Sequence, residues 1–374
     1  MSLAISGMGW VTPLGKGVPF VWERLLKNER PVAETISSPL NDRSYPVFRV
    51  PPSAMSDAPI HPRLRRSSAI SRFAAIAGLS ALDNARITLD AEIAARTALV
   101  FAISNGGVIY TKRFYHEVVE SGAQAASPLL FPETVFNAPA SHLAAILGLS
   151  GATYTLVGDG AVGLLALKMA EDLMQSEALD RCLVVAAEET DWLLCNAYAK
   201  WRLLRSAPPI ETFASPPRGM ILSEGAGAIL LERSGTVVVD RIEAGSNFAM
   251  RTEAAARVDK VFAPLCDGEA IDLVIASANG TFIDLAERHA ILRHCPDALI
   301  FAPKQLLGES VGASALWQLI CAAESLRTQR LPASSLPIAQ HDGRAQSHSP
   351  PQSAVVSACG LNQQVAGARL RVFA

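Results

Sequence analysis

A recurring order of short apolar runs and longer helical segments limits the folds open to this chain. Apolar runs of five to seven residues alternate with segments in which apolar side chains return at helical spacing. The predicted strands are residues 97–103, 153–157, 182–187, 273–277, 298–302, 354–358 and 368–373, and the predicted helices are residues 67–85, 161–176, 284–294 and 312–327. Such alternation requires crossover connections and predicts an α/β fold whose buried parallel sheet carries helices on both faces.

The alternation occurs once in each half of the chain. A Ser-Gly pair at residues 234 and 235 separates the two occurrences, so we expect comparable halves at 1–234 and 235–374. The first half is interrupted by prolines at positions 31, 39, 46, 51, 52, 59 and 62. Because proline is excluded from helix interiors and central strands, this stretch is predicted to be surface loop.

Composition excludes several classes of partner and location. Lys and Arg number 33 against 35 acidic residues, a net charge of -2, which provides no field for binding nucleic acid. Half of the residues are hydrophobic, yet no apolar run reaches the roughly 18 residues of a membrane span. The N-terminus lacks a basic signal-peptide region, and the six cysteines show no CxxC spacing. We therefore expect a cytoplasmic protein with reduced thiols and either a large core or a broad face against another subunit.

A glycine cluster follows the predicted strand 153–157. Residues 158–163 read Gly-Asp-Gly-Ala-Val-Gly, and Glu188 ends the next predicted strand. This pattern is typical of dinucleotide-binding loops, where backbone amides hold a pyrophosphate and an acidic side chain binds the ribose. The same glycines also permit a tight strand-to-helix turn in a crowded core. The cluster alone leaves both interpretations open.

Four further segments occur in a fixed order and extend over essentially the whole chain. They are residues 7–15 followed by 22–26, residues 131–151 followed by Tyr154-Thr155, residues 213–232 with the run Leu-Ser-Glu-Gly-Ala-Gly-Ala, and residues 304–313. Together they resemble the beta-ketoacyl synthases, the condensing enzymes of fatty acid and polyketide synthesis. The resemblance implies a thiolase-like fold, a five-layer αβαβα sandwich of two pseudo-repeated halves that works as a dimer. Residues 1–234 and 235–374 would be its N-terminal and C-terminal ketosynthase-like halves.

The resemblance also implies which positions carry catalysis, and here the chain departs from the family. Gly160 stands where the acyl-accepting cysteine is expected, Asn279 replaces the first catalytic histidine and Glu309 replaces the second. Lys304 is retained. Asn279 could donate one hydrogen bond, whereas an ionised Glu309 would repel a developing enolate, so we expect it to form an ion pair with Lys304. The glycine-rich loop that closes the family's pocket is reduced to Gly-Leu-Asn-Gln at 360–363.

No other group of residues predicts a reaction. The histidines show no zinc-like spacing with cysteines or carboxylates, so neither a metal nor another cofactor is expected. Cys182 begins a predicted strand and Cys321 lies on an apolar helical face, which favours core packing over a nucleophile for both. No Ser-His-Asp hydrolase triad is predicted from the sequence.

These observations favour a ketosynthase-like chain-length factor without activity of its own. The resemblance implies that it pairs with an active beta-ketoacyl synthase as a heterodimer and shapes the tunnel for a chain carried by an acyl carrier protein, in polyketide, aryl polyene-like or fatty acid-type biosynthesis. Expected tunnel or interface residues are Leu130, Phe131, Val135, Phe136 and Leu164. Expected contacts for an acidic carrier protein are Arg63, Arg65, Arg66, Lys200, Arg202 and Arg205.

Two alternatives from other classes remain at this point. A divergent acyltransferase or condensing enzyme would use Asp159, Glu309 or a shifted cysteine in place of the missing thiol. A dinucleotide-dependent oxidoreductase would use the glycine cluster at 158–163 together with Glu188.

Overall fold

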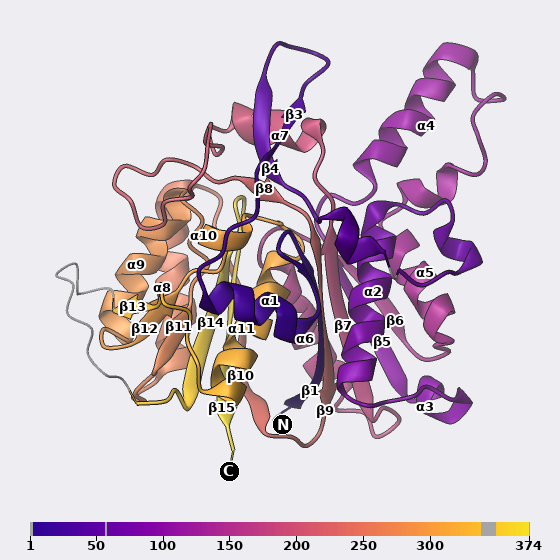
Figure 1. The fold of residues 1–374 in the computed structure, drawn as a ribbon. Helices are drawn as coiled ribbons and strands as arrows, with labels where there is room; N and C mark the ends of the chain where they lie inside the picture. Colours follow the sequence, from indigo (N-terminus) through magenta and orange to yellow (C-terminus); the bar gives the residue numbers. More distant parts are fainter. Residues whose placement is uncertain (1–2, 57, 338–348, 374) are drawn as a thin grey trace.

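The computed structural model of the protein describes residues 3–56, 58–337 and 349–373. Helices, a sheet, a central pair of helices, a second sheet and further helices follow one another across the width of the molecule (Figure 1). The predicted αβαβα arrangement is therefore confirmed.

The first half provides one sheet, with strands in the order β1-β9-β7-β5-β6. Their bounds are β1 Leu3–Thr12, β9 Gly225–Glu232, β7 Arg181–Glu188, β5 Thr97–Ile103 and β6 Thr153–Val157. The first two neighbouring pairs are antiparallel and the next two are parallel. Strands β5 and β7 are buried along nearly their whole length, as their continuous apolar runs predict.

The second half repeats this pairing pattern in the order β10-β15-β14-β11-β12, with the short β13 added at the edge. The bounds are β10 Val237–Asn247, β15 Gln364–Val372, β14 Ser353–Cys359, β11 Leu273–Ile275, β12 Leu299–Phe301 and β13 Leu336–Pro337. Again two antiparallel pairs precede two parallel ones. The same order of pairing in both halves is the structural form of the predicted pseudo-repeat.

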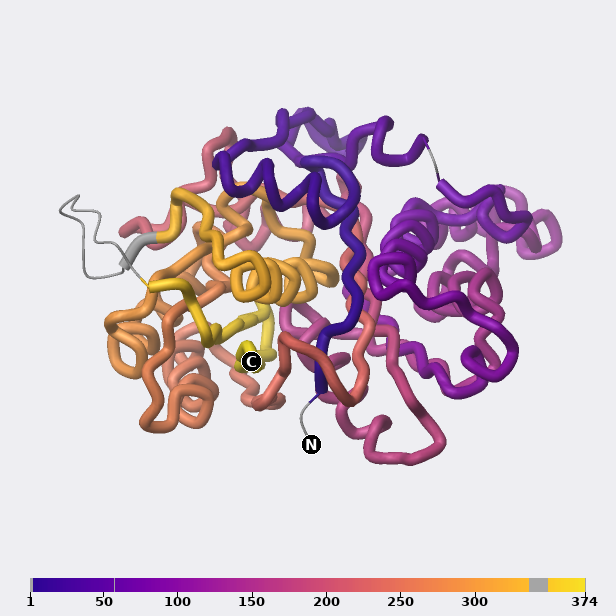
Figure 2. Tube along the Cα trace, turned by 60° about the horizontal axis from the view of Figure 1, so that its bottom comes forward, coloured from indigo at the N-terminus to yellow at the C-terminus, as the bar shows by residue number. Residues whose placement is uncertain are grey.

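The two sheets meet where β1 pairs with β10, with Leu3 opposite Val239 and Ala4 opposite Val238. Figure 2 shows β1 running between the two halves of the molecule. The predicted boundary at residues 234 and 235 falls in the turn between β9 and β10. That the halves are separate domains stays a prediction.

Two helices fill the space between the sheets. They are α6 (Val162–Leu173) and α11 (Ser314–Thr328). Each contacts strands of both halves, and every residue of α11 from 314 to 326 is buried. A helix enclosed on all sides is a core element, and α6 and α11 belong to the largest apolar cluster.

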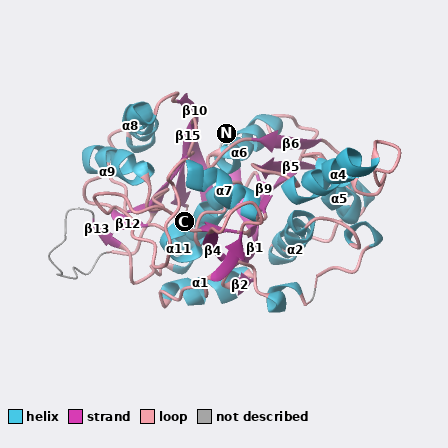
Figure 3. Ribbon diagram, turned by 90° about the horizontal axis from the view of Figure 1, so that it is seen from above, coloured by secondary structure: helices cyan, strands magenta, loops and turns pink. Residues whose placement is uncertain are grey.

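The outer layers cover the other face of each sheet. Helices α2 (Ala69–Asn84) and α5 (Ala138–Leu147) pack on the first sheet, and α8 (Ala254–Cys266) and α9 (Phe282–His294) lie outside the second. Figure 3 shows these two pairs at opposite sides of the molecule.

The remaining elements lie above the sheets and around their edges. They are α1 (Val18–Leu26), α3 (Ala91–Ala95), α4 (Val108–Ser121), α7 (Trp192–Lys200), α10 (Lys304–Leu307), β2 (Gly15–Lys16), β3 (Glu34–Ser37), β4 (Ser44–Phe48), β8 (Leu222–Ser223) and the 3-10 turns Pro52–Met55, Pro62–Leu64, Phe131–Thr134 and Arg251–Glu253. The prediction that the Pro-rich stretch is all loop was wrong, because β3 and β4 form a small sheet with β8. Pro46 lies in β4 opposite Thr35, while β4 joins β8 only through the next two residues.

Helix α4 differs from the other long helices because it stands out from the body of the molecule (Figure 1). Its side chains, all within the described part of the chain, include none that is buried. Within residues 3–56, 58–337 and 349–373, no helix is long and apolar enough to cross a membrane.

Candidate functional site

Gly160 lies in the loop between β6 and α6, where the family resemblance places the acyl-accepting cysteine. A Cβ at this position would lie 3.4 Å from Cα of Gly360 and 3.5 Å from the carbonyl oxygen of Cys359. Gly160 is not among the glycines with a left-handed backbone in the described chain. Neither the backbone conformation nor the space at Cβ therefore requires glycine. The presence of glycine matters chemically, because it leaves position 160 without a nucleophile.

The other two substituted positions meet the retained lysine at the C-terminal half of the site. Nζ of Lys304 lies 2.8 Å from Oε2 of Glu309, and Nδ2 of Asn279 donates to the same oxygen at 2.7 Å. These three residues are at most 2% exposed. The predicted ion pair is therefore confirmed, and it is a buried pair.

Asn279 has no donor left for a guest. Its Nδ2 group donates to Glu309 and to Sδ of Met220 at 3.7 Å. Its Oδ1 accepts from the backbone N–H and the hydroxyl of Thr281 at 3.2 and 2.6 Å. The hydrogen bond that Asn279 was expected to be able to donate to an enolate is thus made to partners within the protein. A preorganised donor for an enolate oxygen would need to point into open space.

Two buried carboxyl groups support this arrangement from α9. Asp284 accepts from the backbone N–H groups of Asn279 and Gly280, and Glu287 accepts from that of Ser277 at 2.7 Å. Burial raises the pKa of Asp284 to about 6 and that of Glu287 to about 7. These acids hold the backbone around Asn279 and do not face a cavity among those described below.

The three cysteines that the sequence offers as nucleophile candidates, Cys182, Cys321 and Cys359, do not replace the missing thiol. All six cysteines are buried and free. Cys359 is the one beside Gly160, and burial together with the Glu287 carboxylate raises the pKa of its thiol. Burial also raises the pKa of Cys182 to about 12 and that of Cys321 well above its ordinary value. The reactive thiolate is therefore disfavoured at these three positions, in agreement with their prediction as core thiols.

The glycine cluster serves packing. The Glu188 carboxylate accepts from the backbone N–H groups of Ser104 and Asn105 at 3.0 and 3.2 Å and is only 2% exposed. A Cβ on Gly163 would lie 2.9 Å from that of Ala315, so α6 and α11 approach closely there. Because Glu188 is enclosed and already bonded, it cannot bind a ribose. The dinucleotide interpretation of this motif is wrong.

A cavity of about 730 Å³ opens next to the substituted nucleophile position. Its walls come from the ends of β5 and β6, from α7 and from the turn before β15. The lining residues are Ser104, Asn105, Val157, Gly158, Asp159, Leu194, Ala197, Tyr198, Trp201, Asn362, Gln363 and Gln364. Burial raises the pKa of the Tyr198 hydroxyl, so it is protonated at neutral pH.

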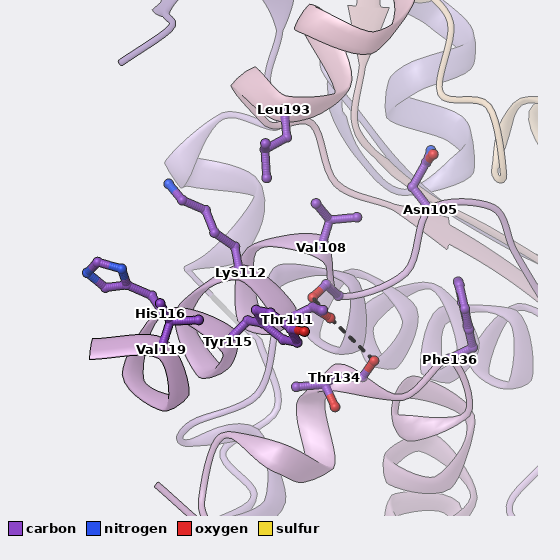
Figure 4. A pocket seen from close by; sticks show the side chains of 11 residues that line it. Asn105, Val108, Thr111, Lys112, Tyr115, His116, Val119, Thr134, Phe136 and Leu193 are labelled. Carbon is purple, nitrogen blue, oxygen red and sulfur yellow. Dashed lines mark hydrogen bonds between the residues drawn. The ribbon is translucent and has the colours of Figure 1, made fainter. Parts of the chain in front are cut away.

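A second cavity, of about 650 Å³, lies along α4 and is shown in Figure 4. Val108, Lys112 and Tyr115 enter from α4, while Phe136 and Leu193 come from other elements. Most of the wall is apolar. Helix α4 was not among the predicted helices, although the spacing of Val108, Tyr115 and Val119 places them on one helical face and was a usable signal.

The predicted tunnel and interface residues separate into two groups. Phe131, Val135 and Phe136 are 56%, 39% and 43% exposed, and Leu130 is half-buried. Leu164 is completely enclosed in the core between the sheets. Leu164 therefore has no exposed surface for a contact with a partner as the structure stands, and a place in a tunnel wall stays a prediction.

The predicted carrier-protein contacts lie at two places. Arg63, Arg65 and Arg66 are exposed and line one side of a cavity of about 350 Å³. Lys200 and Arg202 are exposed at the end of α7. Arg205 is half-buried, and it donates to the Ala207 carbonyl and to Glu211. Arg205 is therefore corrected to a structural residue, while the other five stay predictions.

No group of His, Cys, Asp and Glu that could hold a metal ion occurs among the residues that the structure describes.

Similarity to known proteins identifies the family and the fold of this chain. Residues 2–236 match the family model "Beta-ketoacyl synthase, N-terminal domain". A 3-oxoacyl-[acyl-carrier-protein] synthase 2 of Vibrio harveyi is 24% identical over 150 residues, which are 40% of this chain and only 36% of that protein.

Among solved structures, the ishigamide ketosynthase/chain length factor superposes with a TM-score of 0.84 at 17% identity, covering 100% of this chain and 99% of that one. The ketosynthase ApeO in complex with its chain length factor ApeC from Xenorhabdus doucetiae gives 0.79 at 17% identity, covering 100% and 98%. These likenesses show the thiolase-like fold. The family model matches well over half of the sequence, and the chain therefore belongs to the beta-ketoacyl synthase family.

Proposed function

We propose that this protein is a non-catalytic chain-length factor of the cytoplasm, which pairs with an active beta-ketoacyl synthase and shapes the space for a carrier-bound acyl chain. The observation that carries the proposal is the buried contact of Lys304, Glu309 and Asn279, together with a glycine at position 160. The Glu309 carboxylate is paired with Lys304, and a glycine has no group for holding an acyl chain. The chain would therefore contribute shape and contacts, and its partner would contribute the chemistry.

The surface supports a partner. Strand β6 pairs with β5 and, among the described strands, with no other, so its outer edge is open. Its side chains Tyr154 and Val157 are 43% and 52% exposed. An open edge with apolar side chains invites pairing with a strand of another chain. A second subunit at this edge would also cover apolar surface that a monomer rarely exposes.

Helix α4 and the segment 131–136 lie in the same half as this edge and extend the apolar surface. Tyr115 and Val119 are 68% and 71% exposed, and the ring of Phe131 lies 5.7 Å from that of Phe114. A helix of 14 residues that buries none of them within its own chain gains its stability most simply from a partner. We call β6, α4 and residues 131–136 the apolar face.

The acyl chain would lie in the cavity along α4, which is bounded by this face. The proposal rests on the size and apolar lining of the cavity, because alkyl and polyene chains are held by apolar walls. Whether the pathway makes a polyketide, an aryl polyene-like chain or a fatty acid-type chain depends on the partner and the carrier. The similar solved structures of a ketosynthase/chain length factor and of a ketosynthase in complex with its chain length factor support the proposed pairing of this chain with a ketosynthase.

The test is reconstitution with the ketosynthase encoded beside this chain. Size exclusion with light scattering should show a one-to-one pair, and the pair should release products of one length from carrier-bound substrates. Variants that narrow the cavity, such as Val108→Phe, should shorten the product. The proposal would be refuted if the two proteins did not form a complex. It would also be refuted if the length of the ketosynthase's product did not depend on the presence of this chain.

The alternative of a divergent acyltransferase finds less support. Its candidate groups are Asp159, Glu309 and a shifted cysteine, and both carboxylates already accept hydrogen bonds within the protein. The nearest thiol, Cys359, is enclosed and has a raised pKa. Turnover of a carrier thioester by the isolated chain would restore this alternative.

A further inference from the structure

Asp159 joins the two halves of the protein at the substituted site. Its carboxylate accepts the backbone N–H groups of Asn362 and Gln363 at 3.1 Å each, and that of Ala161 at 3.4 Å. The first two donors lie 203 and 204 residues later in the sequence. Asp159 is only 9% exposed. One carboxylate therefore connects the loop before α6 to the turn at 360–364.

The turn is shaped around this carboxylate. The N–H of Gly360 donates to the Gln364 carbonyl at 2.6 Å, which closes the turn, and that of Phe248 donates to the Gln363 carbonyl at 2.8 Å. A Cβ on Gly360 would lie 2.0 Å from both carboxylate oxygens of Asp159, so only glycine fits beneath them. The side chains of Asn362 and Gln363 are exposed. The inner side of the turn is thus filled by Asp159, and its outer side faces solvent.

This contact lies between two parts of the site. On one side is the 730 Å³ cavity, which Asp159, Asn362 and Gln363 help to line. On the other side, Ser277 Oγ accepts from the Cys359 N–H at 3.0 Å and from Nζ of Lys304 at 3.3 Å. The turn and Asp159 therefore form a wall between the cavity and the buried Lys304–Glu309 pair.

We propose that Asp159 is an internal latch that holds the turn at 360–364 closed over Gly160. Its carboxylate occupies amide donors that would otherwise be able to bind a carbonyl oxygen of a guest. The cavity consequently ends at this wall, and a guest in it does not reach Lys304. The latch makes the site closed as well as short of a nucleophile. The proposal rests on the contacts of Asp159 and is independent of the pairing with a ketosynthase.

Hydrogen exchange read by mass spectrometry tests the latch in the full chain. The variant Asp159→Ala removes all three acceptor contacts, so the amides of Asn362 and Gln363 should exchange at least about tenfold faster than in the parent protein. Asp159→Asn keeps one oxygen acceptor without the charge and should increase the exchange rate of these amides by less. If Asp159→Ala does not fold, the exchange of Asp159→Asn is measured in its place.

Asp272→Ala is the matched control, because the Asp272 carboxylate accepts two backbone N–H groups, those of Gln352 and Ser353, at 2.9 Å each. This variant should accelerate exchange of the Gln352 and Ser353 amides and leave the exchange rates of the Asn362 and Gln363 amides unchanged. Equal exchange of Asn362 and Gln363 in the parent protein and in Asp159→Ala would overturn the latch.

A thiol probe measures closure directly. In the Gly160→Cys variant the new thiol would lie under the closed turn, and iodoacetamide should alkylate it slowly. Adding Asp159→Ala should increase the rate of alkylation at position 160 at least about tenfold, measured on the peptide by mass spectrometry. Equal rates in the two backgrounds would contradict a closed turn. Co-purification with the ketosynthase, measured on the same variants, reports on the proposed function separately.

Discussion

The buried centre and the apolar face of this protein use their residues in opposite ways. In the centre, Lys304 and Asn279 both contact Oε2 of Glu309, and the three residues are almost without exposed surface, although Oε1 of Glu309 has no hydrogen-bond partner among the described residues. On the apolar face, Tyr115, Val119 and Val157 are more than half exposed, and α4 buries none of its described residues. The polar groups at the substituted positions are thus enclosed within the protein, while a large apolar surface is left uncovered. The comparison teaches that a contribution of this chain to a larger assembly is to be sought on the apolar face.

The largest effect should come from breaking the buried pair. Lys304→Met leaves the Glu309 carboxylate buried without its counter-charge, so the free energy of unfolding should fall by about 3–5 kcal/mol. The double variant Lys304→Met/Glu309→Gln keeps an acceptor for Asn279 and should recover most of this loss. Urea denaturation measures both. A single variant as stable as the parent would show that the pair is not the structural centre.

The apolar face should respond to charge without loss of folding. Val157→Asp on β6 places a carboxylate in the proposed interface, and the affinity for the ketosynthase should fall by at least about 2 kcal/mol, or roughly thirtyfold. Leu292→Asp on α9 is the control, since that side chain is 42% exposed on the other side of the molecule. Titration calorimetry with circular dichroism as a folding check distinguishes the two variants. Equal weakening by both would remove the face as the interface.

Stability of the isolated chain should fall as the pH rises. Burial raises the pKa of Glu188 from 4.5 to about 8 and that of Glu287 from 4.5 to about 7. Between pH 4.5, the pKa of both groups in the unfolded chain, and their raised pKa values in the folded protein, only the folded protein keeps these protons. The contribution of the two groups to the free energy of unfolding is therefore greatest near pH 4.5 and decreases up to about pH 8. Each such group contributes a slope of about 1.4 kcal/mol per pH unit.

Glu188→Gln mimics the protonated acid and should flatten the profile by one such slope, as measured by urea denaturation between about pH 5 and 8. Glu92→Gln, on the exposed surface, is the control. An unchanged slope in Glu188→Gln would contradict burial as the cause.

The smallest effect is expected at the arginines beside the 350 Å³ cavity. Arg63→Glu, Arg65→Glu and Arg66→Glu should each weaken binding of an acidic carrier protein by about 0.2–1 kcal/mol, and the loss should shrink as salt is added. Fluorescence anisotropy with a labelled carrier protein measures this. Arg293→Glu on α9 is the control, with 71% of its side chain exposed. Binding that is indifferent to all three changes would place the carrier contact elsewhere.

Sequence patterns predicted the centre better than the surface. The family resemblance pointed to Gly160, Asn279 and Glu309 as the substituted positions, and the charge of Glu309 beside the retained Lys304 led to the expected ion pair, which the structure confirms. The pair could be predicted because it depends on which charged groups are present. The burial of Leu164 could not be predicted, since apolar spacing does not tell whether a second sheet covers the other side of a helix.

Contacts between distant segments were the other gap. Asp159 was considered only as a replacement nucleophile, because its partners at 362 and 363 lie in the other half. The hairpin of β3 and β4 depends on β8, about 175 residues further on, and its prolines favoured a loop. Both features arise from tertiary pairing that local patterns do not encode.

Intact mass spectrometry of the reconstituted pair, after incubation with an acyl carrier thioester, tests the central claim most directly. We expect the acyl mass on the ketosynthase alone, with this chain unmodified. A stable acyl adduct on this chain would contradict the account.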